Sequence, residues 1–509
     1  MITVETSGAD PVSEAVLFSF DDRAIPWKDN LHLTLVQAEK HSGNPVLRTG
    51  PEGSHDSTQA FLYGSVIEVD GKFRMWYLAS WAKGSDSDFW LDEKGWWRPM
   101  CYAESDDGIH WTKPDLGLVE YNGSRNNNIC LIEPEGSLVA RVGDFLSVMH
   151  DPDDPDPSRR YKTAYIMVAS PKDVHGGIRA VVDSDFRLPL MACATSADGL
   201  TWQVVGDRPC VNEKFEVSSL YRFGDFYYAG GQQVTPWTWL PDGSDCWRVW
   251  TTYRSSDFEH WSRAKAMSFA RPGQRTVPPV AGQETHMGAG LWHRGNVLVG
   301  LYGMWQDGGS EDPDVVLDGT RIDLGLVCSD DGLYFREPVP DFKVIPRGEE
   351  HEWDAIGLTQ GHAFANVGDR TLIWYGHWDC ENRNRSEEIG LATLRRDGFG
   401  YLSRHHESMP GHFQTCRLMS GNGHLKLFAN VDGVSPETPL KIELVDALDR
   451  PIPEFSGANA TELTTSGTRQ LIHWPVSGSS DCSLNERFAV KVGFPPRGDA
   501  RLYALYVAD

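Results

Sequence analysis

Several features that mark whole classes of proteins are missing from this sequence of 509 residues. No stretch approaches the roughly 20 apolar residues of a transmembrane helix, and the opening residues Met1–Val16 lack the basic and apolar regions of a signal peptide. The nine cysteines are scattered, odd in number and never spaced C-x-x-C. They indicate neither a disulfide framework nor a zinc site. We therefore expect a soluble, cytoplasmic protein with reduced cysteines and no membrane partner.

Basic residues are scarce as well. Lys and Arg number 47 against 72 Asp and Glu, which leaves a formal net charge of -25. Because such a chain repels a phosphate backbone, nucleic acid is not an expected partner. The motifs G-x-S-x-G, G-x-x-x-x-G-K-[ST] and H-E-x-x-H and the dinucleotide fingerprint are also absent. Serine hydrolases, NTPases, zinc proteases and Rossmann oxidoreductases are therefore not indicated.

The sequence does contain an internal repeat that combines a turn with an aromatic residue. Its copies are Ser105–Trp111, Ser196–Trp202, Ser255–Trp261 and Ser329–Phe335, with a weaker one at Arg395–Tyr401. In the pattern S-x-D-G-x-x-W, Asp supplies a side-chain hydrogen bond and Gly supplies permissive backbone dihedrals. The ring at the seventh position is expected to fill a hydrophobic layer.

Short β-rich runs separated by tight turns precede these copies. The turns are expected at Asp70-Gly71, Gly224-Asp225, Arg294–Asn296 and Gly368-Asp369. Such pairs between β-rich runs indicate hairpins. A hairpin followed by a third strand that ends in the repeated turn is typical of a propeller blade. Helical periodicity is nearly absent, so we predict an all-β protein with a five-bladed β-propeller.

The repeat stops near residue 404. The remaining residues alternate apolar and polar positions between Gly, Pro and Asp turns, as in an antiparallel β-sandwich. We therefore predict a propeller domain over residues 1–404 and a β-sandwich domain over residues 405–509. One early strand, Ala15–Phe20, is expected to pair with the last blade and close the ring.

A propeller with S-x-D-G-x-x-W turns, an opening Asn44-Pro-Val-Leu segment and an appended sandwich resembles a known group of glycoside hydrolases. It is similar to the invertase-levanase and arabinanase-xylosidase families. The resemblance implies a glycosidase that cleaves a terminal glycosidic bond of a carbohydrate, with a furanoside (β-fructofuranoside or α-arabinofuranoside) as the first expectation. The N-D-P-N-G, R-D-P and E-C motifs of the invertase branch are missing, which indicates a divergent member.

Members of these families hold three carboxylates in the central funnel, at the starts of inner strands, because one carboxyl must be protonated and another ionised during glycosidic cleavage. Asp144 and Glu216 each stand three residues before a Ser on an inner-strand run. The resemblance assigns Asp144 as the helper and Glu216 as the general acid. In the first blade the nearest acid is Asp56, in the segment before the strand, and it takes the role of nucleophile or base.

Polar residues in the fourth and fifth blades are further candidates for substrate contacts. Glu284, His286, Gln360 and His362 occupy expected funnel positions, where they would bind sugar hydroxyls. Trp353, in an acidic and aromatic cluster, is expected to offer a stacking surface. No cofactor is required and no metal ligands are assigned. A structural calcium ion in the propeller channel is left open, and the proline-rich run 151–160 is interpreted as a rigid turn.

Two alternative functions stay open. A glycoside phosphorylase would use the same fold and need basic residues over the funnel, for which Arg383 and Arg385 are the nominated pair. A non-catalytic carbohydrate-binding propeller would explain the missing motifs and the displaced Asp56. The sugar, the linkage, the stereochemical course and the presence of a homo-oligomer are not determined by the sequence.

Overall fold

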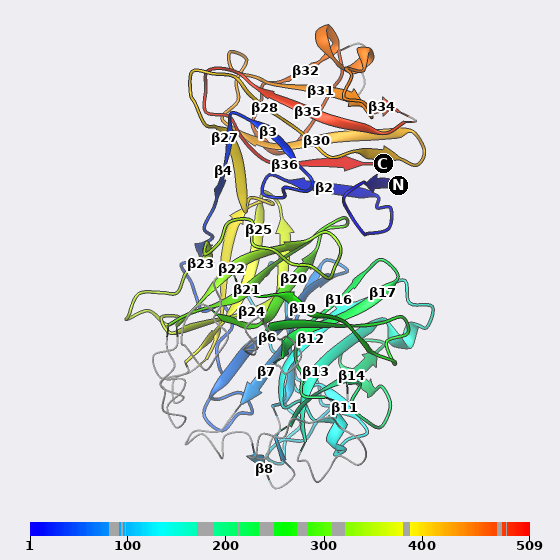
Figure 1. The fold of residues 1–509 in the computed structure, drawn as a ribbon. Coiled ribbons are helices and arrows are strands. Elements are labelled where there is room, and N and C mark those ends of the chain that lie inside the picture. The colour runs from blue at the N-terminus through cyan, green and yellow to red at the C-terminus, as the bar shows by residue number, and fades with distance from the viewer. Residues whose placement is uncertain are drawn as a thin grey trace, which may run out of the picture.

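The computed structural model describes the chain except for residues 81–90, 93–94, 97, 170–187, 212, 234–248, 272–283, 308–320, 380–386, 476–480 and 485. Figure 1 shows a large assembly of strands below a smaller part built from two sheets. The described helices are short 3-10 turns at Leu138–Ala140, Pro157–Arg159, Pro453–Phe455 and Gly457–Asn459. Where the structure describes the chain, no helix is both long and apolar enough to cross a bilayer. The predicted all-β class is confirmed.

The described strands of the larger part pair into successive antiparallel groups. Group 1 contains β6 (Gln59–Val69), β7 (Lys72–Ser80) and β10 (Met100–Ser105). Group 2 contains β12 (Asp144–His150), β13 (Tyr161–Ala169), β14 (Leu188–Ser196) and β15 (Thr201–Val204), to which β11 (Leu131–Glu133) adds in parallel. Group 3 contains β16 (Glu216–Phe223), β17 (Phe226–Gln233), β18 (Val249–Ser255) and β19 (Ser262–Phe269).

The later groups follow the same order. Group 4 contains β20 (Glu284–His293), β21 (Leu298–Asp307), β22 (Arg321–Ser329) and β23 (Lys343–Ile345). Group 5 contains β24 (Gly357–Val367), β25 (Arg370–Trp378), β26 (Ile389–Arg395) and β5 (Glu39–Lys40). A separate short hairpin joins β8 (Leu91–Asp92) to β9 (Gly95–Trp96).

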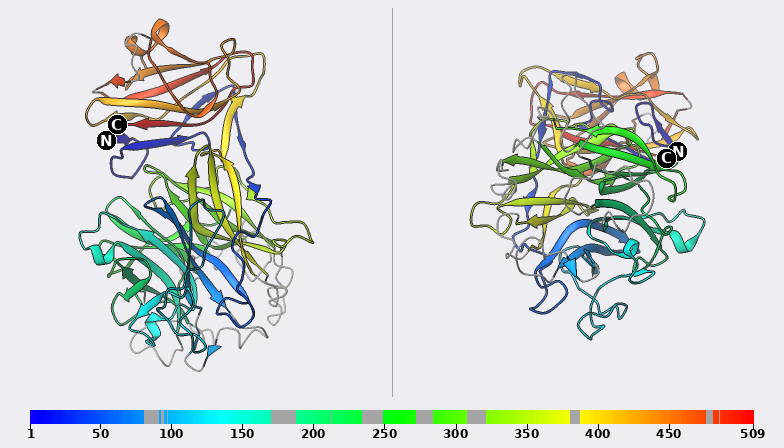
Figure 2. Two further views of the ribbon diagram at one scale, coloured as in Figure 1. Left: turned by 180° about the vertical axis from the view of Figure 1, so that it is seen from behind. Right: turned by 60° about the horizontal axis from the view of Figure 1, so that its bottom comes forward.

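The first strands of the groups, β6, β12, β16, β20 and β24, lie side by side in a closed ring, which we call the inner strands. The ring closes where β24 runs parallel to β6, with His362 opposite Ser65. The remaining strands of each group extend outward from this axis, as the two further views in Figure 2 show. This is the radial arrangement of a β-propeller.

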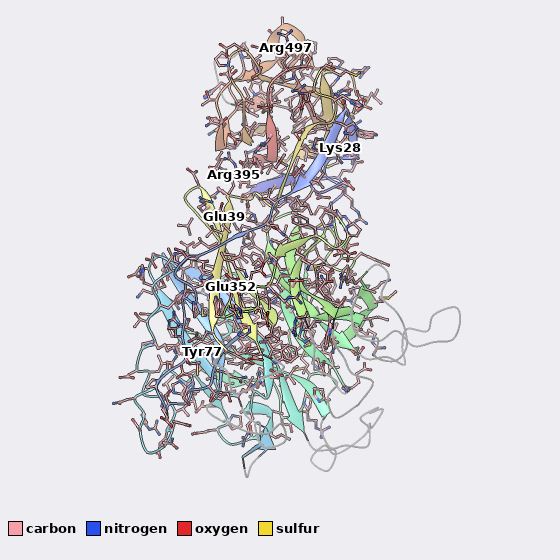
Figure 3. The ribbon with its side chains drawn as sticks, turned by 90° about the vertical axis from the view of Figure 1, so that its left-hand side faces the viewer. Lys28, Glu39, Tyr77, Glu352, Arg395 and Arg497 are labelled. Carbon is pink, nitrogen blue, oxygen red and sulfur yellow. The ribbon has the colours of Figure 1, made fainter. Side chains whose placement is uncertain are left out.

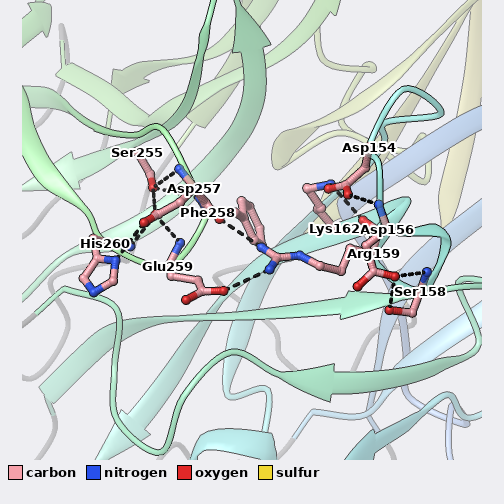
Figure 4. A network of polar contacts seen from close by, with 10 residues as sticks. All are labelled: Asp154, Asp156, Ser158, Arg159, Lys162, Ser255, Asp257, Phe258, Glu259 and His260. Atoms are coloured by element: carbon pink, nitrogen blue, oxygen red, sulfur yellow. Dashed lines mark hydrogen bonds and ion pairs between the residues drawn. The ribbon is translucent and has the colours of Figure 1, made fainter.

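The repeated turns have the predicted hydrogen bonds. In the third copy, Ser255 Oγ accepts from the backbone N–H of Phe258 at 2.9 Å, and the Asp257 carboxylate accepts from the backbone N–H groups of Glu259 and His260 at 2.8 Å (Figure 4). The copies at Ser105, Ser196 and Ser329 repeat this pattern.

These turns also connect neighbouring groups. The carbonyl of Gly199 accepts the Trp76 indole N–H at 2.7 Å, and the carbonyl of Gly108 accepts that of Trp374 at 2.8 Å. Arg159, at the tip of the proline-rich run in group 2, donates to the Asp257 carbonyl and to the Glu259 carboxylate, each at 2.9 Å (Figure 4). Within the described residues, the repeat therefore supplies contacts between groups as well as turns.

The turn glycine at position 199 should not tolerate a side chain. Its φ is +80°, and a Cβ atom there would lie 2.7 Å from the Trp76 ring. Gly206 has a similar φ of +78° but open space around it. Since both substitutions strain the backbone and only one causes a clash, we expect Gly199→Ala to lower the free energy of unfolding by about 1–3 kcal/mol more than Gly206→Ala. Denaturant unfolding of the two variants would measure this, and equal losses would contradict it.

Two sheets form the smaller part. One sheet contains β1 (Ile2–Val4), β3 (Trp27–Asp29), β28 (Gly411–Gln414), β29 (Leu418–Ser420), β31 (Leu440–Asp446), β32 (Thr461–Leu463) and β35 (Phe488–Phe494). The other contains β2 (Glu14–Phe18), β4 (Leu31–Leu35), β27 (Gly400–Arg404), β30 (His424–Asp432), β33 (Gly467–Leu471), β34 (Asp481–Ser483) and β36 (Arg501–Ala508). A shared apolar core lies between them.

The N-terminal strands belong with this sandwich. The strand expected within Ala15–Phe20 forms as β2, but it pairs with β36 of the sandwich instead of the last propeller group, so this part of the prediction was wrong. The outer edge of group 5 is filled by β5, which pairs with β26. The predicted division into residues 1–404 and 405–509 therefore separates β1, β2 and β3 from the C-terminal strands with which they pair, and assigns β4 and β27 to the propeller although they belong to the sandwich.

An apolar interface fixes the sandwich to groups 4 and 5. Phe18 and Phe20 stack at 4.8 Å and meet the edge of Phe399. Arg395, labelled near the junction in Figure 3, donates to the Asn430 side chain at 2.7 Å. The sandwich thus packs near the ends of the inner strands, and the other end of the propeller axis is where the inner strands begin.

Candidate functional site

Irregularities in the inner strands shape the propeller axis. Each of these strands has a register shift near its beginning, and the shifted positions include Asp144/Leu146 in β12 and His286/Ala289 in β20. At two of them a non-glycine residue has a positive φ, namely Phe145 at 36° and Met287 at 63°. Bulges re-aim side chains and are frequent beside functional sites.

The bulges bring four side chains together across the axis, and we call them the axial layer: Tyr63, Phe145, His286 and Gln360. The Tyr63 hydroxyl lies 2.8 Å from Nδ1 of His286, on the opposite side of the ring, and its own ring lies 3.9 Å from that of Phe145. Gln360 donates to the backbone carbonyls of His286 and Gly288 at 3.1 and 2.6 Å. This layer forms a polar and aromatic floor where the inner strands begin.

Two tryptophans border this floor. The His286 ring stacks on Trp378 at 5.1 Å with an interplanar angle of 19°, and it meets Trp305 edge to face at 5.4 Å. Trp378 is half-buried, whereas Trp305 is buried. Of the predicted substrate contacts, His286 and Gln360 therefore lie in the axial layer. The predicted Glu284 begins β20, and its side chain lies outside the described residues.

Asp144 begins β12 and is held by an arginine that the sequence analysis did not single out. Arg98 donates to Asp144 Oδ1 at 2.9 Å, and its guanidinium lies 5.0 Å from the centre of the Phe61 ring. The Arg98 side chain is only 4% exposed and that of Asp144 is 26% exposed. Burial raises the pKa of Asp144, and the Arg98 charge opposes that shift.

Glu216 begins β16, the inner strand next to β12. Its carboxylate accepts from Gln232 Nε2 at 2.7 Å, and Gln232 Oε1 in turn accepts from the backbone N–H of Met287 at 3.1 Å. Glu216 is thus tied through Gln232 to the bulge beneath it. Because Asp144 and Glu216 begin adjacent strands of one ring, the structure brings these two predicted carboxyls to the same end of the axis.

Two further carboxyl groups near Asp144 come from group 5. Glu387 is 2% exposed and its oxygens accept from Gln59 Nε2 at 2.6 Å and from the backbone N–H of Asp379 at 3.2 Å. Burial raises the pKa of Glu387 to about 8, and the charges of Arg98, Asp379 and Asp144 also act on it. No signal in the sequence marks this cluster, because neither Asp379 nor Glu387 belongs to the repeated motif.

Asp56 lies in a different setting from the other predicted carboxylates. It is 2% exposed, accepts from the Tyr77 hydroxyl at 3.2 Å and pairs with Lys113 at 2.5 Å. Burial raises its pKa, but the Lys113 ammonium outweighs this and holds the pKa of Asp56 low. Tyr77 is labelled in Figure 3. The carboxylate is therefore enclosed in a structural ion pair, and the structure does not bring it together with Asp144.

Group 5 contains a second copy of this arrangement. Asp354 is 1% exposed, accepts from the Tyr375 hydroxyl at 2.9 Å and pairs with Lys40 at 2.7 Å. The backbones match too, since Gly50 N donates to the Asp56 carbonyl and Gly348 N to the Asp354 carbonyl, both at 3.1 Å. Asp56 is thus one of two equivalent residues that anchor the segments leading into β6 and β24.

Two other predicted substrate contacts lie elsewhere. His362 bonds the backbone of Leu220 and Leu291 and lines a cavity of about 770 Å³ at the opposite end of the axis, together with the final residues of the inner strands. Burial lowers its pKa to about 4. Trp353 packs against Tyr375 and His377 within group 5, with ring centres 5.8 Å apart in both pairs.

Two residue sets bear on cofactors and acceptors. Among the described residues, no group of three or more His, Cys, Asp or Glu side chains is arranged to hold a metal ion. The nominated phosphate contacts Arg383 and Arg385 lie outside the described residues. The described cysteines are free thiols.

Comparisons with known proteins give limited similarities. No family model matches the chain. Two uncharacterized proteins of Mycobacterium tuberculosis, from strains CDC 1551 and H37Rv, are each 31% identical over 112 residues, which is 21% of this chain. The chain spans about a third of the length of these curated relatives, with 33% of each covered.

Several solved structures are similar in shape. One comes from a study of the GH130 family of mannoside phosphorylases, which contains glycoside hydrolases that target β-1,2 mannosidic linkages in Candida mannan. It is 15% identical in sequence, the match covers 71% of this chain and 94% of that chain, and the TM-score is 0.42. A glycosyl hydrolase from Bacteroides ovatus has 13% identity, 72% and 96% coverage and a TM-score of 0.44. A β-1,2-mannobiose phosphorylase from Listeria innocua has 12% identity, 70% and 96% coverage and a TM-score of 0.43.

Proposed function

We propose that this protein is a carbohydrate-active enzyme that cleaves a terminal glycosidic bond at the end of the axis where the inner strands begin. The observation that carries the proposal is the placement of Asp144 and Glu216 at the starts of adjacent inner strands, above the axial layer. Paired carboxyl groups supply the acid and the base that glycosidic cleavage requires. Aromatic and hydrogen-bonding side chains next to them suit the apolar faces and hydroxyl groups of a sugar.

We assign different roles to the two carboxyls. Asp144 is bonded to a cation, Arg98, which favours its ionised form against the effect of burial. Glu216 is bonded to the neutral amide of Gln232. Because of its bond to Arg98, we assign Asp144 to hold and polarise the substrate as a carboxylate, and Glu216 keeps the role of proton donor that the resemblance to glycosidases gives it. Asp56 takes no part in this proposal, because its carboxylate is already paired with Lys113.

Water is the acceptor that we favour over phosphate. Phosphate would have to bind beside the half-buried Asp144 carboxylate, and like charges in a partly buried site repel. We expect a screen of chromogenic furanosides and pyranosides to find a substrate whose hydrolysis proceeds at the same rate with and without inorganic phosphate. Release of the free sugar, without sugar 1-phosphate, would be followed by chromatography.

The same screen separates the alternatives. Sugar release that depends on phosphate and yields sugar 1-phosphate would identify a phosphorylase and contradict the choice of acceptor. Binding of a sugar without turnover of any glycoside would favour the non-catalytic propeller. The resemblance to the invertase-levanase and arabinanase-xylosidase families makes furanosides the first compounds to test, and the choice between sugars remains part of the proposal.

A further inference from the structure

The carboxyl group of Glu387 lies behind the proposed site in a fixed position. The Glu387 backbone is bonded to the segment leading into β6 on both sides, because its N–H donates to the Thr58 carbonyl and its carbonyl accepts from Ala60 N–H. The side chain is 2% exposed, so it does not reach a substrate directly. Any influence of this carboxyl on the reaction must act through its neighbours.

Of the described side chains whose charges act most strongly on Glu387, one is a cation and two are acids. These charged side chains are Arg98, Asp379 and Asp144. The adjoining segments of group 5 also contain the titratable residues His377 and Glu388. Arg98 is bonded to Asp144 at 2.9 Å. A buried carboxylate without a cation partner costs several kcal/mol, and such a group keeps its proton instead. Within the described part of the chain, Glu387 is bonded to an amide and to a backbone N–H, and neither of these is a cation.

The amide of Gln59 fits a neutral Glu387 in either of its two orientations. As placed, Nε2 donates to Glu387 Oε2 at 2.6 Å, while the buried Oε1 of Gln59 has no hydrogen-bond partner in the described part of the chain. Turned over, the amide would direct Oε1 at Glu387 and accept its proton, since the two amide atoms occupy equivalent positions. A protonated Glu387 would therefore give the buried Gln59 oxygen a hydrogen bond in exchange for the one that Nε2 now donates.

We propose that Glu387 is a positioning residue. Because its carboxyl group remains neutral, it forms a hydrogen bond with Gln59 and leaves the charge of Arg98 to Asp144. This inference deepens the proposed function and rests on it for its effect on catalysis. If Glu387 ionises, it competes with Asp144 for the guanidinium and weakens the bond that fixes Asp144 at the start of β12. Activity should then fall as Glu387 loses its proton. Since burial raises its pKa to about 8, this loss of activity is expected above neutral pH.

The test is the variant Glu387→Gln, which keeps the shape and removes the ionisation. For wild type we expect kcat/KM to fall as Glu387 loses its proton, and we expect the variant to lack this part of the fall, so that the ratio of variant to wild type rises about tenfold between about pH 7 and about pH 9. Glu388→Gln is the matched control, since that carboxylate accepts from Thr49 N–H and pairs with Arg48. Its profile should follow wild type. Parallel profiles for Glu387→Gln and wild type would overturn the proposal.

A second measurement does not depend on turnover. An acid whose pKa is higher in the folded state stabilises the protein below its unfolded pKa, near 4.5, and loses that contribution as pH rises toward about 8. The thermal midpoint of Glu387→Gln, relative to wild type, should therefore increase from about pH 5 to about pH 8 by several degrees. A difference that stays constant with pH overturns the inference. A growing difference supports it even if no glycoside is cleaved, which would count against the proposed function alone.

Discussion

Replacing Glu216 with Gln, and separately Asp144 with Asn, is expected to lower turnover by about 10²–10⁴-fold while the fold stays intact. Each change keeps the size of the side chain and removes its ability to ionise. The Gln at position 216 can still bond Gln232, and the Asn at position 144 still faces Arg98. Initial rates on the substrate found in the glycoside screen would measure the loss.

A matched control separates chemistry from general damage. Asp225 lies in the exposed turn of the same β16–β17 hairpin, at the opposite end from Glu216, so Asp225→Asn should leave both turnover and stability unchanged. The thermal midpoints of Glu216→Gln and Asp225→Asn should stay close to that of wild type, whereas Asp144→Asn should lower it, because it removes the carboxylate that the buried Arg98 bonds. Undiminished hydrolysis by Glu216→Gln would remove its assignment as the proton donor.

The parts of the fold that could be predicted are those whose interactions are local in sequence. The turn at Ser255 is fixed by hydrogen bonds to residues two or three positions away, so the repeat reveals it directly. The shared register of Asp144 with Ser147 and of Glu216 with Ser219 was also informative. In the structure these serines bond neighbouring inner strands, Ser147 Oγ to the Ser218 carbonyl and Ser219 Oγ to the Ala289 carbonyl.

The interactions that were missed join segments far apart in the chain. Arg98 meets Asp144 because group 2 packs beside group 1, and Glu387 meets Gln59 because the ring brings group 5 back against group 1. No spacing rule encodes such a pair. The pairing of β2 with β36 was missed for the same reason, since an alternating strand looks alike whichever sheet it joins.

The equivalence of Asp56 and Asp354 is visible in the sequence, although Asp56 was predicted to be a nucleophile or base. The six-residue spacing from Gly50 to Asp56 recurs from Gly348 to Asp354, so an alignment of the first and fifth blades would have identified the two acids as equivalent. The resemblance to glycosidases instead favoured the acid nearest to the expected inner strand. Equivalence in a repeat favours a structural role, because a catalytic residue has no need of a copy in another blade.

Asp56→Asn and Asp354→Asn are therefore expected to have the same effect, which is a loss of stability with little change in the turnover of the folded enzyme. Each leaves a lysine, Lys113 or Lys40, without its carboxylate partner. Removing one partner of a buried ion pair costs about 3–5 kcal/mol, and since Lys113 and Lys40 are 24% and 25% exposed we expect about 2–3 kcal/mol.

Denaturant unfolding would measure the loss for both variants, and active-site-normalised rates at a temperature where both remain folded would measure turnover. The double replacement of Asp56 by Asn and Lys113 by Met provides the control, because removing both charges should recover part of the stability that the single change loses. The opposite result would be that Asp56→Asn lowers turnover by orders of magnitude at unchanged stability, while Asp354→Asn does not. Asp56 would then be the nucleophile or base, and the two ion pairs would be alike in geometry but not in function.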